Sequence, residues 1–447
     1  MIKTPIKLLR YNTGNDKKAF VKFKNSFDAV IFNATIVAYS GSSIADLVSI
    51  HKRQYIIDPQ TYIFQHSTNI IQNKEKTGIK KSVQKYLDEL PVRLCDILKA
   101  NKILSFDDVE SILDDLVHAV YDFQKNYVKK FLCKKEYDKY LEFAAINFPS
   151  PKFVISPYFM LKKEYNDSEI HAWMELNKKS FIETKSVSVD DDVATQIVID
   201  KELLLKNCFF DEIYNMFKDL SGTYTFLWID DFDSFEASPD YQDGYLKLLK
   251  LFSELSVYPI MAYGGYDSIL LCNKDIKYGL YGVAQSVGYG EKRQITPVGG
   301  GLPVNKYYFL PLHRRLKFGD AAQILYKNGY FDPSVSNKQH ALDYYKNICG
   351  CKQCRKVIAN DIDNFDVYNE SVPFSIKGKN GLVNRNRPTT YAGYISAIHF
   401  LHSKVNEWNA IQSVDKIELR NQIIDAYNKY MPSQCAAITL WCDKYVD

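Results

Sequence analysis

The chain has 447 residues, 46% of them hydrophobic and 25% charged, which suits one large domain with additions or two to three smaller ones. A net charge of +4 is too small to identify a nucleic-acid partner by itself. The first residues do not form a signal peptide, and no apolar run reaches the roughly 18 residues of a membrane span. The nine cysteines are an odd number. We therefore expect no membrane contact and a reducing, cytoplasmic setting, in which clustered cysteines bind metal.

Short, strongly apolar runs are typical of parallel strands that are buried on both faces. The chain contains eight such runs, at residues 28–38, 54–58, 152–161, 223–230, 258–264, 278–285, 306–313 and 329–332. Helical patterns lie between many of them. Alternating strands and helices predict an α/β fold with a parallel sheet, and eight such units predict a TIM-type (β/α)8 barrel. An open, doubly wound sheet is the alternative.

Two stretches depart from this alternation. Residues 67–150 are mostly helical in pattern, with one apolar stripe at Val109, Ile112, Leu113 and Leu116. They predict a helical insertion after the second run. Beyond residue 340 come a cysteine-rich segment, a polar loop and helical patterns. We expect residues 1–340 to form the barrel with its insertion, and residues 341–447 to form a zinc-binding, helical subdomain.

The cysteine-rich segment carries the most specific motif of the chain. Cys349, Cys351 and Cys354 have the spacing C-x-C-x-x-C, and His399 and His402 follow. Such a loop can direct three thiolates at one tetrahedral zinc ion and leave the fourth position for an imidazole. A disulfide in an exported protein and three unrelated thiols are the alternatives. We expect His399, on the more apolar stretch, to be the fourth ligand, and a four-ligand zinc to be structural.

Three aspartates end apolar runs, where barrel enzymes place their active sites. Asp58 ends Tyr55–Asp58, Asp230 ends Phe226–Asp230, and Asp332 ends Gly329–Asp332. A charge next to an apolar run is costly unless it faces a polar cavity. Each aspartate alone is as well explained by a helix cap or a turn. Together they favour one shared acidic site.

Glycines and basic residues follow two other runs. Gly264 and Gly265 would let the backbone approach a flat ligand closely, although ordinary loop flexibility also explains them. Arg314, Arg315 and Lys317 follow the run at 306–313 directly. They would lie on the rim of the barrel and contact phosphates, and a plain surface patch is the alternative.

These features together resemble the tRNA-guanine transglycosylase superfamily, which combines a TIM barrel with a C-x-C-x-x-C…H zinc subdomain. The remaining similarities are short. Gly329-Tyr330-Phe331-Asp332 resembles the context of the family's nucleophilic aspartate, and Ile57-Asp58-Pro59 resembles that of its second aspartate. Ile229-Asp230-Asp231 resembles the family's base-recognising Phe-Asp-Glu, and Tyr263-Gly264-Gly265 resembles its Gln-Gly-Gly. The chain lacks the family's Ser-Gly-Gly after Asp58 and its Pro-Thr-Arg after Asp332. The resemblance is therefore to a divergent, DNA-acting or phage-defence-associated relative.

The resemblance implies a pentosyltransferase that exchanges guanine for a 7-deazaguanine derivative in tRNA or DNA through an aspartyl intermediate. It implies Asp332 as nucleophile, Asp58 as acid and base, and Asp230, Tyr263, Gly264 and Gly265 as base-binding residues. Arg314 and Arg315 are expected to be further substrate contacts because of their place after the run at 306–313. A barrel N-glycosidase and a catalytically inactive barrel that binds nucleic acid or a nucleoside are the alternatives. The acceptor, the incoming base and a homodimeric state stay open.

Overall fold

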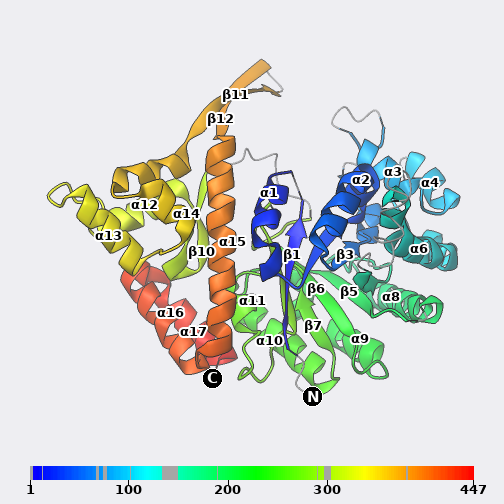
Figure 1. Cartoon of the computed structure of the whole chain (residues 1–447). Coiled ribbons are helices and arrows are strands. Elements are labelled where there is room, and N and C mark those ends of the chain that lie inside the picture. The colour runs from blue at the N-terminus through cyan, green and yellow to red at the C-terminus, as the bar shows by residue number, and fades with distance from the viewer. Residues whose placement is uncertain are drawn as a thin grey trace.

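A computed structural model of the chain describes residues 4–12, 14–66, 70–73, 78–100, 102–132, 150–188, 190–288, 290–295, 304–378 and 381–446. Eight parallel strands close into a barrel in chain order (Figure 1). They are β1 (Ile6–Tyr11), β2 (Ala29–Asn33), β3 (Tyr55–Asp58), β4 (Pro151–Ile155), β5 (Val193–Asp200), β6 (Tyr224–Asp230), β7 (Tyr258–Met261) and β8 (Gly282–Ser286). The predicted TIM-type barrel is confirmed.

The predicted set of strands was wrong at two places. Residues 306–313 form β9 (Lys306–Phe309) and a short 3-10 turn, and β9 pairs with β10 (Arg314–Lys317) outside the barrel. Residues 329–332 form a turn. The barrel instead uses β1 and β5, whose apolar runs are interrupted by polar residues such as Arg10 and Gln196.

Helices surround the barrel. They are α1 (Gly14–Phe23), α2 (Ala34–His51), α6 (Leu113–Leu132), α8 (Asp167–Val187), α9 (Asn207–Phe217), α10 (Pro239–Glu254) and α11 (Tyr266–Leu270). Three short helices join α6 between β3 and β4: α3 (Lys81–Leu87), α4 (Val92–Lys99) and α5 (Phe106–Glu110). The predicted helical insertion is therefore present, and its residues 133–149 lie outside the described part.

A second body follows β8 in the chain (Figure 1). It contains β9, β10, α12 (Phe318–Lys327), α13 (Asn337–Asn347), α14 (Lys352–Ile358), a 3-10 segment (Ile362–Asn369), β11 (Ser371–Gly378) and β12 (Gly381–Pro388). The long helix α15 (Thr390–Ser413) then packs against α1 and α11 of the barrel. Helices α16 (Lys416–Tyr430) and α17 (Pro432–Tyr445) end the fold.

The barrel strands thus end at Ser286, whereas the division at residue 340 remains a prediction. In the described part of the chain, no helix combines the length and the apolar character that crossing a membrane requires.

Candidate active site and metal centre

The strand register gathers polar side chains at the carboxyl end of the barrel, which we call the barrel mouth. Residues paired across parallel strands point to the same face. Asn33 pairs with Asp58 and Asp200 pairs with Asp230. Arg10, on β1, contacts Asp58 across the interior, so this row faces inward. Asp200 and Asp230 line one cavity there, so the mouth carries three carboxylates, from β3, β5 and β6.

Asp58 lies at the end of β3 as predicted, and its carboxylate is ion-paired and hydrogen-bonded there. Its Oδ2 accepts a hydrogen bond from Arg10 Nη1 at 2.8 Å, and its Oδ1 accepts one from the Tyr158 hydroxyl at 2.6 Å. Both members of the ion pair are only 1% exposed. Arg10 also donates from Nε to the Ala262 carbonyl at 2.8 Å and stacks 4.2 Å from the Tyr263 ring centroid. These contacts hold Asp58 below the surface of the mouth.

We expect Arg10→Met to destabilise the fold by about 3–5 kcal/mol, because it leaves the Asp58 carboxylate buried without its cation. Lys130→Met is the matched control, since the Lys130–Glu89 pair is exposed and such pairs contribute about 0–1 kcal/mol. Urea unfolding followed by circular dichroism measures both. Equal losses in the two variants would contradict the importance of the buried pair.

A cavity of about 610 Å³ opens at the mouth, over the ends of β4, β5 and β6. Asp200 and Asp230 line it together with Lys162 and Lys201. Asp200 accepts a hydrogen bond from the Lys163 amide at 2.8 Å, and Asp230 accepts one from the Ile295 amide at 2.6 Å. Neighbouring strands lie about 4.8 Å apart, so the register places the two carboxyl groups side by side.

Burial raises the pKa of both carboxyl groups of this pair above that of a surface aspartate. Burial, with the charge of Asp200 adding to it, raises the pKa of Asp230 to about 6 against the opposing Ile295 hydrogen bond. Burial also raises the pKa of Asp200. Two adjacent carboxyls cannot both ionise easily, so the pair can keep a proton near neutral pH. Asp230 is thus suited to donate a proton.

Aromatic rings lie deeper in the barrel, where Trp228 precedes Asp230 by two residues on β6 and therefore points to the same face. Tyr263 packs 4.8 Å from Trp228 between ring centroids, and the Arg293 guanidinium lies over both rings at 5.2 and 5.3 Å. The next two residues are glycines with close neighbours. A Cβ at Gly264 would lie 2.3 Å from Val283 Cγ2, and one at Gly265 would lie 2.8 Å from Asp267 Oδ1. Gly264 is therefore needed for close packing after β7, whereas the Asp267 side chain can rotate away from a Cβ at Gly265.

Asp332 does not belong to this site, which corrects the prediction that it ends the last barrel strand. It lies in an exposed turn between α12 and α13, where its Oδ1 accepts hydrogen bonds from the Ser334 amide at 2.8 Å and hydroxyl at 2.7 Å. These bonds hold the pKa of Asp332 below its ordinary value. The structure does not bring it together with Asp58 or Asp230, so a nucleophile at the mouth must be another residue.

Two of the three predicted phosphate contacts, Arg314 and Arg315, have different surroundings. Arg315 donates from Nη1 to the carbonyl of Val287, directly after β8, at 2.7 Å. It therefore lies on the rim of the mouth. Arg314 forms an ion pair with Glu236 and donates to Gln434 Oε1 at 2.7 Å, so its charge is largely compensated.

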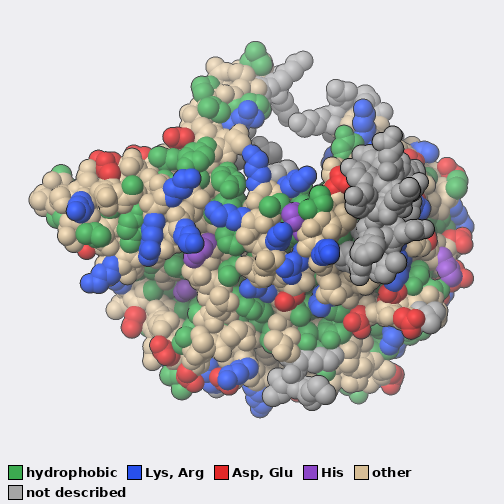
Figure 2. Space-filling model, viewed as in Figure 1, with side chains coloured by type: hydrophobic (Ala, Val, Ile, Leu, Met, Phe, Trp, Pro, Cys, Tyr) green, Lys and Arg blue, Asp and Glu red, His purple; other side chains and the backbone are tan. Residues whose placement is uncertain are grey.

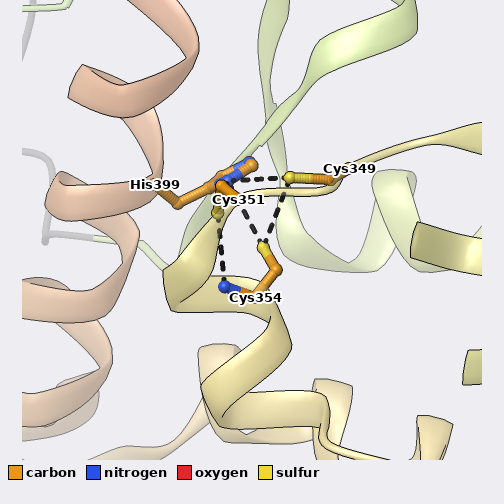
Figure 3. Close-up of side chains that lie close together, drawn as sticks. All are labelled: Cys349, Cys351, Cys354 and His399. Carbon is orange, nitrogen blue, oxygen red and sulfur yellow. Dashed lines mark hydrogen bonds between the residues drawn. The ribbon is translucent and has the colours of Figure 1, made fainter. Parts of the chain in front are cut away.

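A buried metal centre lies in the second body. Cys349, Cys351, Cys354 and His399 bring their ligand atoms within 4.8 Å of one another and can hold one metal ion (Figure 3). The three sulfur atoms lie 3.4–3.6 Å from His399 Nδ1. Tetrahedral zinc, with bonds of about 2.3 Å to sulfur and 2.0 Å to nitrogen, places its ligand atoms roughly 3.5–3.8 Å apart. His402 lies outside the cluster, so of the two histidines the structure brings His399 to the cysteines.

The surroundings orient these ligands. The His399 ring packs 4.4 Å from the Tyr307 ring, and its Nε2 bonds to the Tyr308 carbonyl at 2.7 Å, which leaves Nδ1 as the acceptor that can face a metal. The hydroxyls of Tyr344 and Tyr368 lie 3.4 and 3.3 Å from Cys354 Sγ. Because His399 is on α15, a metal here would fasten the second body to the helix that covers the barrel.

Sequence reasoning missed Asp200 and Arg10. The signal for Asp200 was present, because Ile197-Val198-Ile199-Asp200 repeats the pattern of Ile56-Ile57-Asp58. For Arg10 there was little signal, since a single basic residue in a short apolar run is as common at a sheet edge.

Comparisons with known proteins do not identify a family. No family model matches the chain, and no curated protein matches it. Among solved structures, the chain is similar to Saccharomyces cerevisiae Gas2p in complex with laminaritriose and laminaritetraose, at 12% sequence identity and a TM-score of 0.32. The match covers 63% of this chain and 56% of the Gas2p chain. A likeness this distant supports no conclusion about activity.

Proposed function

We propose that the barrel mouth is an active site that exchanges guanine for a 7-deazaguanine derivative in a nucleic acid. The observation that carries this proposal is the Asp200–Asp230 pair, which lines one cavity and in which the pKa of Asp230 is raised to about 6. Base exchange at a sugar needs this combination: an acid for the leaving base and a carboxylate for the cationic sugar. The choice of guanine and its 7-deaza analogue rests on the family resemblance of the motifs.

In the proposed mechanism, Asp230 donates its proton to the leaving guanine while the C1′–N9 bond breaks. The Asp200 carboxylate stabilises the developing oxocarbenium ion and forms a covalent bond to C1′. Asp230, now charged, then takes the N9 proton of the incoming base. The base nitrogen forms the new bond to C1′ and releases Asp200. Retaining glycosidases hold such carboxyl groups about 5–5.5 Å apart, close to the spacing of adjacent strands.

We propose zinc as the metal of the second body, bound by the three cysteines and His399. A four-ligand zinc contributes folding energy and has no open position for substrate. Asp58, tied to Arg10 and Tyr158, would shape the floor of the site rather than move protons.

The pH dependence of exchange tests the assignment of the acid. Because the pKa of Asp230 is raised to about 6, its acidic form is lost as the pH rises through that value. We expect kcat/KM for incorporation of labelled guanine to fall above pH 6. The measurement runs from pH 4.5 to 8 at constant ionic strength, with tRNA and duplex DNA as acceptors.

Two outcomes separate the alternatives. Release of free guanine with no incorporation would identify a barrel N-glycosidase. Binding of nucleic acid with neither release nor incorporation would identify an inactive barrel. A flat pH profile with full exchange would contradict Asp230 as the acid.

A further inference from the structure

A two-stranded ribbon projects from the second body, on the side of the barrel mouth (Figure 1). Strands β11 and β12 pair over their whole length, from Ser371 opposite Pro388 to Gly378 opposite Gly381, and among the described residues no third strand joins them. Most of the described side chains on the ribbon are exposed, including Leu382 at 77%. A two-stranded ribbon is only marginally stable by itself, and its exposed faces and free edges are open to a binding partner.

The charged residues of the ribbon sequence are all basic. Residues 371–388 contain Lys377, Lys379, Arg385 and Arg387 and no acidic residue, whereas the whole chain is nearly balanced, with 57 basic and 53 acidic residues. Arg387 stacks 5.0 Å over the ring of Phe374. No described acidic side chain forms an ion pair with Arg385 or Arg387. The charges of Arg385 and Arg387 are therefore available to an anionic partner.

The register divides the ribbon into two faces. Phe374 is opposite Arg385 and Val372 is opposite Arg387, so the arginines share a face with apolar residues. Ser375 is opposite Asn384 and Pro373 is opposite Asn386, so the other face presents amides. Amide side chains can bond the edge of adenine with two hydrogen bonds, and arginines can bind phosphates or guanine.

Basic residues continue from the ribbon toward the barrel. Arg387 and Lys317 line one pocket of about 270 Å³ at the base of the ribbon. Lys317 is on β10 beside Arg315, which contacts the Val287 carbonyl at the rim of the mouth. Figure 2 shows lysine and arginine side chains gathered on the face below the ribbon. A polyanion held by the ribbon would thus extend to the proposed active site.

We propose that the ribbon lies in the major groove of duplex DNA and positions that DNA at the barrel mouth. Its eight residues per strand span about 27 Å at roughly 3.4 Å per residue. The major groove of B-form DNA, about 12 Å wide, admits a two-stranded ribbon, whereas the major groove of A-form RNA is too narrow and deep. This inference rests on the proposed function for its nucleic-acid partner and adds the form of that partner.

Binding of a fluorescein-labelled 24-base-pair DNA duplex, measured by anisotropy at several KCl concentrations, tests the ribbon. We expect Arg385→Ala/Arg387→Ala to weaken binding at least tenfold and to lower the slope of log Kd against log[KCl] by about 1.8, for two lost phosphate contacts. Lys338→Ala/Lys346→Ala on α13 removes the same charge from exposed positions of the same body. This control should keep the wild-type slope.

Two further measurements test whether the ribbon contacts the major groove and whether its partner is DNA and not RNA. Methylation of guanine N7, which lies in the major groove, should interfere with binding of the wild-type protein and not of the double arginine variant. An RNA duplex of the same sequence should bind equally to both proteins. An unchanged slope in the arginine variant, no interference at N7, or an equal loss with RNA would each overturn the proposal. Because binding is measured without an incoming base, wild-type protein that binds the duplex through the ribbon but exchanges no base would support this inference and contradict only the proposed chemistry.

Discussion

Replacing Asp230 by Asn is expected to lower kcat/KM for base exchange by about 10²–10⁴-fold, the usual contribution of a positioned general acid. The amide keeps the shape of the side chain and its contact with the Ile295 amide, but it has no proton to give to the leaving base. The rate should also lose its fall above pH 6. Steady-state incorporation of labelled guanine, with circular dichroism to confirm folding, measures the effect.

Asp332→Asn is the matched control, because Asp332 is an exposed turn residue whose carboxylate bonds only to Ser334 among the described residues. It should exchange bases at the wild-type rate. Full activity in Asp230→Asn, with no activity in Asp332→Asn, would return the nucleophile to the residue that the motif resemblance indicated.

Replacing Cys354 by Ser is expected to remove the metal and to destabilise the second body. Structural zinc contributes about 10–16 kcal/mol of apparent binding free energy in zinc-finger peptides, so losing one of three thiolates should cost several kcal/mol. Its hydroxyl neighbours, Tyr344 and Tyr368, would then surround a weaker ligand. Metal analysis by mass spectrometry gives the zinc content, and urea unfolding gives the stability.

Cys435→Ser controls for the loss of a thiol as such, since Cys435 is a half-buried cysteine on α17 outside the cluster. It should keep one zinc per chain and nearly the wild-type stability. Stoichiometric zinc in Cys354→Ser, with unchanged unfolding, would show that the cluster does not bind metal through this thiolate.

The features that sequence predicted well are those whose determinants are local. Three cysteines within six residues need only one loop to converge, and His399 was identified by the apolar stretch around it. The barrel itself followed from repeated apolar runs between helical patterns. Six of the eight predicted runs are barrel strands. The total of eight was right only because the two wrong runs, 306–313 and 329–332, equal in number the two missed strands, β1 and β5.

The features that sequence missed depend on distant parts of the chain. Tyr330 and Phe331 looked like the end of a buried strand, but Tyr330 is buried in the second body and Phe331 packs near Phe365 there. Gly329 has a φ of +81°, which suits a turn and not a strand. Arg10 and Asp58 are 48 residues apart, and only barrel closure shows that they pair. The Asp200–Asp230 pair likewise exists only through the strand register.

The central claim is base exchange at the barrel mouth, and a mass spectrum of the acceptor tests it most directly. Zinc-loaded protein is incubated with duplex DNA or tRNA and a 7-deazaguanine derivative, and the acceptor is then digested to nucleosides. We predict that one acceptor gains the 7-deazaguanine nucleoside and releases an equal amount of guanine, and that Asp230→Asn yields neither product. Acceptors that remain unchanged after incubation with folded, zinc-loaded protein would contradict the account.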